Sequence, residues 1–138
     1  TGMTGHQQNP TTGYNIKGDP AGKIDLESLC RAMGIRRVTV VDPYDLDACD
    51  RAVKEELAAT EPSVIISRRP CALLKYVKHK PALVVDQDKC VGCRACMKLG
   101  CPAISIRGKK AMIDATQCVG CGVCSKLCRP GALGEVTK

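Results

Sequence analysis

Eight of the 11 cysteines lie in the C-terminal part of the chain, at spacings that suit the binding of a metal cluster. They form two triplets, each followed by a fourth cysteine: Cys90, Cys93, Cys96 and Cys101, then Cys118, Cys121, Cys124 and Cys128. Three thiolates two residues apart can surround one corner of an iron–sulfur cubane, which needs four soft ligands. The spacings C-x2-C-x2-C-x4-C and C-x2-C-x2-C-x3-C therefore predict two [4Fe–4S] clusters.

The two cysteine runs belong to an internal repeat with an offset of 28 residues. Val84-Val85-Asp86 precedes the first run as Met112-Ile113-Asp114 precedes the second. Within the runs the offset relates Cys90/Cys118, Val91/Val119, Gly92/Gly120, Cys93/Cys121, Cys96/Cys124, Lys98/Lys126 and Leu99/Leu127. A repeat that carries its ligands at matching places predicts a pseudo-symmetric pair of sites.

Residues 81–138 thus resemble a bacterial-type two-cluster ferredoxin, an α+β domain. In that family the fourth cysteine of each run binds the cluster of the other run. The resemblance implies one cluster on Cys90, Cys93, Cys96 and Cys128, and a second on Cys118, Cys121, Cys124 and Cys101. The chain departs from the family pattern at Gly100, an extra residue before the fourth cysteine, and at Arg129, where proline usually follows. Neither departure removes a ligand.

Two other uses of the cysteines are weaker alternatives. A structural zinc site needs four ligands, usually two cysteine pairs, so two triplets exceed its needs. A disulfide framework is disfavoured because the number of cysteines is odd. Three cysteines fall outside the triplets. Cys30 and Cys49 lie on apolar faces of predicted helices, where cysteine behaves as a small buried hydrophobe. Whether these, Cys71 or His6 have a function is left open.

The composition favours a cofactor-dependent fold for the C-terminal segment. The chain has no Phe or Trp, and Tyr14, Tyr44 and Tyr76 all precede the triplets. A segment of about 58 residues without aromatic side chains buries little apolar area and would be marginally stable alone. Two clusters, each bonded to four side chains, can take the place of that core and make folding depend on the cofactor.

The charge of the chain points to an acidic redox partner. The formal net charge of +7 counts the ligand thiols as neutral. Since each oxidised cluster with four thiolates carries about −2, the loaded chain would carry about +3. Residues 81–138 hold nine basic and four acidic residues, against 12 and 10 in residues 1–80. No stacking aromatic or DNA-reading motif accompanies this basic segment, so we expect no nucleic-acid partner and prefer complementarity to an acidic protein.

The N-terminal part has the pattern of an α/β domain. A Gly- and Pro-rich loop over 1–23 is followed by a helix that Asp25 can cap and Gly34 ends. Residues 37–41 are β-branched and predict a strand, and a second helix is expected from Leu46 to about Ala59. Val64-Ile65-Ile66 predicts the next strand. Strand, helix and strand in this order indicate a parallel βαβ unit.

One βαβ unit cannot bury both faces of its sheet, so we expect this part to belong to a larger α/β layer. The chain begins with Thr1, in a turn-rich stretch, which favours a fragment of a longer polypeptide. We place a domain boundary between 80 and 81. No run of about 18 apolar residues and no signal peptide is visible, so we expect no membrane-spanning helix and a cytoplasmic location.

Two short segments give this N-terminal part a more specific resemblance. Residues 1–7 read Thr-Gly-Met-Thr-Gly-His-Gln, and residues 65–71 read Ile-Ile-Ser-Arg-Arg-Pro-Cys. The first is similar to the end of the thiamine-diphosphate motif in 2-oxoacid:ferredoxin oxidoreductases. With the appended two-cluster domain, the chain resembles the C-terminal portion of the large (alpha) subunits of indolepyruvate:ferredoxin oxidoreductases.

The resemblance implies a site and a reaction. Thr1, Met3 and Thr4 would lie beside thiamine diphosphate, whereas the Mg ligands of the family would lie upstream of this chain. The complete complex, with a small (beta) subunit, would decarboxylate an arylpyruvate such as indolepyruvate, form an acyl-CoA from coenzyme A and reduce an acidic ferredoxin under anaerobic conditions. This chain would supply the electron exit, and no catalytic residue can be named in it. The alternative is a two-cluster electron-transfer ferredoxin that stands alone or serves another complex.

Overall fold

The computed structural model describes residues 5, 7–74 and 76–135 of the 138-residue chain. The chain divides into two compact units, Thr1–Val77 and Lys78–Lys138. No helix within the described ranges is long and apolar enough to cross a membrane.

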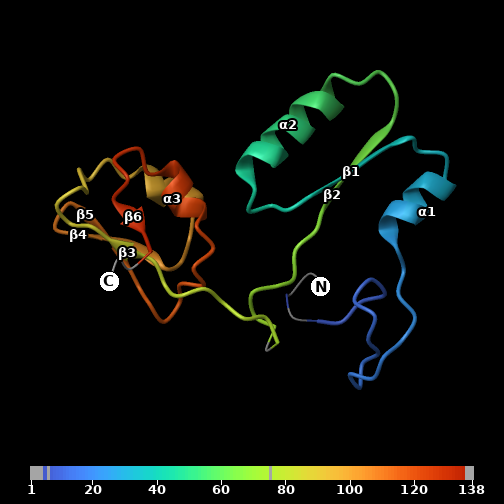
Figure 1. The fold of residues 1–138 in the computed structure, drawn as a ribbon, viewed down its shortest axis with the longest axis horizontal. Helices are drawn as coiled ribbons and strands as arrows, with labels where there is room; N and C mark the ends of the chain where they lie inside the picture. The colour runs from blue at the N-terminus through green and yellow to red at the C-terminus, as the bar shows by residue number, and fades with distance from the viewer. Residues whose placement is uncertain (1–4, 6, 75, 136–138) are drawn as a thin grey trace. The chain divides into compact units, whose positions relative to one another are not determined.

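Parallel strands and the helices beside them form the first unit (Figure 1). Its elements are α1 (Leu26–Ala32), β1 (Arg37–Val41), α2 (Leu46–Leu57) and β2 (Ser63–Ser67). β1 and β2 pair in parallel, from Arg37 opposite Ser63 to Val41 opposite Ser67. The predicted βαβ unit is therefore confirmed.

Aspartates begin both helices of this unit, as N-cap residues should. The carboxylate of Asp25 accepts a hydrogen bond from the backbone N of Glu27 at 3.1 Å. That of Asp45 accepts one from the backbone N of Ala48 at 3.2 Å. Each bond satisfies a backbone donor that has no partner inside its helix.

The apolar faces of the helices are less covered than the sequence pattern predicts. α1 has no buried residue, and its Leu29 is 46% exposed. Cys30 and Cys49 are half-buried rather than buried. The Sγ of Cys49 donates a hydrogen bond to the backbone O of Asp42 at 3.3 Å, so this thiol is not simply an apolar group. Two strands cover only part of each helix face, which accounts for the difference.

The second unit is made of short strands and helices (Figure 1). They are β3 (Val84–Val85), the 3-10 helix η1 (Ala95–Leu99), β4 (Ile104–Arg107), β5 (Lys110–Ile113), α3 (Val123–Leu127) and β6 (Leu133–Gly134). β4 and β5 form an antiparallel hairpin, and β3 pairs antiparallel with β6. The core holds four aliphatic side chains and two of the predicted ligands: Leu83, Ile104, Ala111, Leu133, Cys96 and Cys124.

The sequence repeat reappears in the backbone hydrogen bonds of this unit. Asp86 N donates to Ala132 O at 2.7 Å, and Asp114 N donates to Ala103 O at 2.8 Å. In each bond the donor and the acceptor belong to different halves of the repeat. The acceptor directly precedes a strand, β6 for Ala132 and β4 for Ala103. η1 and α3 also occupy positions that differ by the offset of 28. The two halves therefore form a pseudo-symmetric pair.

Candidate iron–sulfur centres

Similar turns lead into both cysteine triplets. The backbone O of Asp86 accepts from Cys90 N, and that of Asp114 from Cys118 N, both at 3.0 Å. The two carboxylates also close the turns. Hydrogen bonds lower the pKa of both carboxyls: the largest contribution comes from the backbone N–H of Lys89 for Asp86 and from the hydroxyl of Thr116 for Asp114. Charged carboxylates thus fix the start of each triplet in the same way.

The first predicted ligand set lines a single cavity. Its volume is about 360 Å³, counting its open mouth. Four thiols face it, three from the first triplet and the fourth from the end of the second run: Cys90, Cys93, Cys96 and Cys128. The rest of the lining is mostly apolar and includes Val85, Val91 and Leu133. Four soft donors around an apolar cavity fit an iron–sulfur cluster, which needs thiolates and little competing water.

The second predicted set also gathers around a buried thiol. The pKa of Cys124 is raised to about 11, first by burial and then by the thiols of Cys121, Cys118 and Cys101, because a second negative charge nearby is unfavourable. The pKa of Cys96 is raised in the same way, first by burial and then by Cys128, Cys93 and Cys90. A bound metal centre would hold these sulfurs as thiolates.

Backbone donors cross between the halves to the cysteine sulfurs. Ala111 N donates to Cys90 Sγ at 3.5 Å, and Leu83 N donates to Cys118 Sγ at 3.4 Å. These pairs are related by the offset of 28, so each half supplies a donor to the other. The Ala111 bond is the main cause that lowers the pKa of Cys90. These donors could not be predicted from the sequence, since every non-proline residue has a backbone N–H.

The zinc alternative can be compared with the same geometry. Sulfur atoms around a tetrahedral zinc ion lie about 3.8 Å apart, given Zn–S bonds of about 2.3 Å. Within residues 5, 7–74 and 76–135, no three His, Cys, Asp or Glu side chains are grouped closely enough to hold a single metal ion.

A glycine in each triplet allows close approach of the opposite backbone. A Cβ added to Gly92 would lie 2.3 Å from Lys109 O, and one added to Gly120 would lie 2.4 Å from Pro81 O. Both glycines have positive φ, +70° and +63°. The contacts are again related by the offset of 28. Only glycine fits these two turns without displacing backbone.

We expect Gly92→Ala to destabilise the second unit by about 3 kcal/mol, since it combines an unfavourable φ with a backbone clash. Gly131→Ala is the matched control. Its φ is +66° but a Cβ there would meet nothing within 4 Å, so it should cost only about 1 kcal/mol. Thermal loss of the cluster absorbance in the two variants measures the difference. Equal midpoints would show that the hairpin backbone moves freely away from Gly92.

The predicted thiamine contacts fall on the first residues of the chain. Thr1, Met3 and Thr4, like His6, lie outside the described residues. Gly5 is described, and a Cβ on it would lie 3.3 Å from the Sγ of Cys71. Gly5 therefore lies beside the segment after β2 in the first unit.

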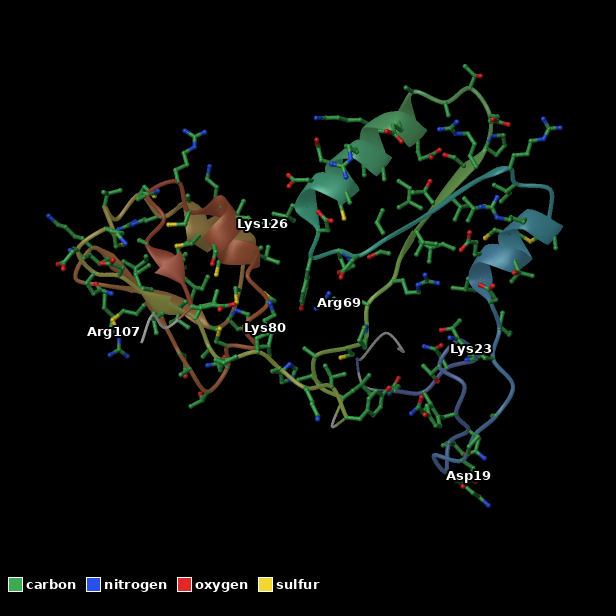
Figure 2. The ribbon with its side chains drawn as sticks, viewed as in Figure 1. Asp19, Lys23, Arg69, Lys80, Arg107 and Lys126 are labelled. Atoms are coloured by element: carbon green, nitrogen blue, oxygen red, sulfur yellow. The ribbon has the colours of Figure 1, made fainter. Side chains whose placement is uncertain are left out.

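A further group of side chains, missed in the sequence, lies where β1 and β2 end (Figure 2). The guanidinium of Arg69 forms an ion pair with Asp42 and stacks over the ring of Tyr44, 4.0 Å from its centroid. Because the two strands are parallel, their carboxyl ends lie at the same edge of the sheet. The predicted βαβ order could therefore have indicated that these three residues lie close together. The ion pair links the loop after β1 to the loop after β2.

Two known family models match successive parts of the chain. Residues 82–129 match the 4Fe-4S dicluster domain family. Residues 1–67 match the C-terminal TPP-binding domain of thiamine pyrophosphate enzymes. The same chain thus carries the end of a thiamine-binding domain and a dicluster domain in succession.

Curated relatives are similar to nearly the whole of this chain. The indolepyruvate oxidoreductase subunit IorA of Pyrococcus horikoshii is 41% identical over 99% of this chain. That of Methanothermobacter thermautotrophicus is 35% identical over 96%. The chain spans only 22% of the length of each of these relatives. Among solved structures, a membrane-bound sulfane sulfur reductase covers 59% of this chain and 56% of its own, at 26% identity and a TM-score of 0.33.

Proposed function

We propose that this chain, which corresponds to the C-terminal portion of an IorA subunit, is the electron-exit part of a thiamine-diphosphate-dependent 2-oxoacid:ferredoxin oxidoreductase. The proposal assigns residues 1–80 to the end of the thiamine-binding domain and residues 81–138 to a two-cluster domain. The observation that carries it is the gathering of eight thiols into two sets of four, directly after a thiamine-binding domain match.

The ligands in this proposal follow the two sets of thiols. One [4Fe–4S] cluster is held by Cys90, Cys93, Cys96 and Cys128, and the other by Cys118, Cys121, Cys124 and Cys101. When bound, these groups accept and release single electrons. The protein surrounds them with apolar side chains and donates backbone N–H groups to Cys90 and Cys118.

The reaction of the complete complex is part of the same proposal. By its likeness to IorA, the substrate is an arylpyruvate such as indolepyruvate, with coenzyme A as acyl acceptor. A small subunit completes the complex, and Thr1, Met3 and Thr4 lie beside thiamine diphosphate. The enzyme works in the cytoplasm, and an acidic ferredoxin takes the electrons. The chemistry belongs to the cofactor, and the protein supplies position and a route for electrons.

One experiment separates this function from that of a carrier ferredoxin. Native protein isolated anaerobically should contain about eight irons and eight sulfides per chain and about one thiamine diphosphate. It should be brown and should bleach with dithionite. Oxidation of indolepyruvate should depend on coenzyme A and reduce added ferredoxin. Clusters without thiamine would indicate a carrier ferredoxin, and a folded, colourless zinc protein would contradict the iron–sulfur assignment.

A further inference from the structure

The two halves of the second unit differ in how much of each cysteine loop is exposed. Residues related by the offset of 28 can be compared directly. In the first loop Val91 is 71% exposed and Cys93 is exposed. Their equivalents in the second loop, Val119 and Cys121, are half-buried. Since the backbone turns are alike, the difference comes from what lies over each loop.

The segment that leads into the domain covers the second loop. An added Cβ on Gly120 would meet Lys80 Cβ and Lys80 O at 2.8 Å, besides the Pro81 O contact. At Gly92 the corresponding contacts come from the backbone of Lys109 alone, at the tip of the β4–β5 hairpin. The second loop is therefore enclosed at the start of the domain, whereas the first is left accessible to another molecule.

The first loop is also surrounded by basic residues. Between residues 89 and 113 the chain has no Asp or Glu and six basic residues: Lys89, Arg94, Lys98, Arg107, Lys109 and Lys110. Arg94 directly follows the exposed Cys93, Lys98 lies in η1 four residues further on, and Lys109 belongs to the hairpin tip packed on Gly92. Figure 2 shows Arg107, at the same hairpin, well separated from Lys126 on α3.

Two of these cations occupy backbone positions that suit glycine. Arg94 has φ +58° and Lys109 has φ +73°, and they are the two non-glycine residues with positive φ within the described part of the chain. The repeat equivalent of Arg94 is Gly122, with φ +79°. An L side chain is strained in this conformation. Strain kept at an exposed site points to a use for the side chain beyond stability.

We propose that the loop from Cys90 to Cys96 is the face on which an acidic one-electron carrier protein docks. Val91 and the exposed Cys93 form its centre, and Arg94, Lys98 and Lys109 form a basic rim. This inference rests on the proposed function, since it presumes a cluster behind the loop. One electron crosses per encounter: the carrier is reduced by one electron and the domain is oxidised by one, with no bond formed or broken.

The repeat offers a matched pair of variants, Lys98→Glu and Lys126→Glu. Both lysines are exposed and occupy equivalent positions in the two halves. The full chain, reconstituted anaerobically and reduced, is mixed with an acidic [2Fe–2S] ferredoxin at low ionic strength. We expect Lys98→Glu to slow the second-order rate about 10-fold and Lys126→Glu to change it less than about twofold. Arg94→Gly should also slow the reaction without weakening the fold.

Carbodiimide crosslinking of the same mixtures supplies a readout that does not depend on electron transfer. Crosslinks mapped by mass spectrometry should join ferredoxin carboxylates to Lys98 and Lys109. Crosslinks at Lys126 instead, or an equal loss of rate in both Lys→Glu variants, would overturn the docking face. Iron content measured on each sample separates the two proposals. Full iron loading with crosslinks elsewhere refutes only this inference, whereas an unmodified chain that binds no iron refutes both.

Discussion

Cys93→Ala should lower the iron content of the reconstituted chain from about eight to about four or fewer and leave the second unit largely unfolded. The side chain of Cys93 is exposed, so its removal loses almost no packing. Within its described residues, that unit buries only four aliphatic side chains larger than alanine. A small unit with so little buried apolar area depends on its metal centres for folding. A large loss of iron and of folded structure on replacing this exposed thiol would therefore result from the loss of a cluster ligand.

Cys49→Ala is the control for Cys93→Ala. Cys49 is half-buried on α2, in the first unit, and its thiol donates one hydrogen bond to Asp42 O. Its removal should cost about 1 kcal/mol through lost packing and that bond. Iron content, visible circular dichroism and thermal unfolding, measured side by side, distinguish the variants. Equal iron loss in the two would show that the role of Cys49 has been misread.

The repeat made much of the second unit predictable from the sequence. A repeated spacing of ligands implies a repeated backbone path, and the cross-half hydrogen bonds of Asp86 and Asp114 follow that path. Gly100, the extra residue, is the left-handed C-cap of η1, with φ +67°. The extra residue is thus accommodated in the turn between η1 and Cys101. Ligation by the eight cysteines remains a prediction.

The difference between the two halves could not be predicted in this way. Exposure depends on which backbone covers a loop, and Pro81 and Lys109 cover equivalent glycines although their residue types differ. The left-handed backbone conformation of Arg94 could not be predicted either, because arginine rarely adopts a positive φ. In the first unit, the pairing of Arg69 with Asp42 required knowing that two loops meet at one sheet edge.

Electron transfer from the reduced chain to an acidic ferredoxin should slow by about 10-fold or more when the ionic strength rises from 0.01 M to 0.15 M. Over that range the screening length shrinks from about 30 Å to about 8 Å, so the attraction between the exposed charges is lost before contact. Nine basic against four acidic residues in 81–138 supply that attraction. Exposed charges act mainly on the rate of encounter.

Lys110 is not suitable for charge reversal, because its side chain contributes to the fold. Lys110 donates from its Nζ to the backbone O of Gln87, so reversing it would also disturb the fold. Lys98→Glu with Lys109→Glu should instead flatten the salt dependence while iron content stays unchanged. A small uncharged oxidant should react with both proteins at rates that salt does not alter. If the stopped-flow rates with the ferredoxin change neither with salt nor with charge reversal, the basic residues face some other part of the complex.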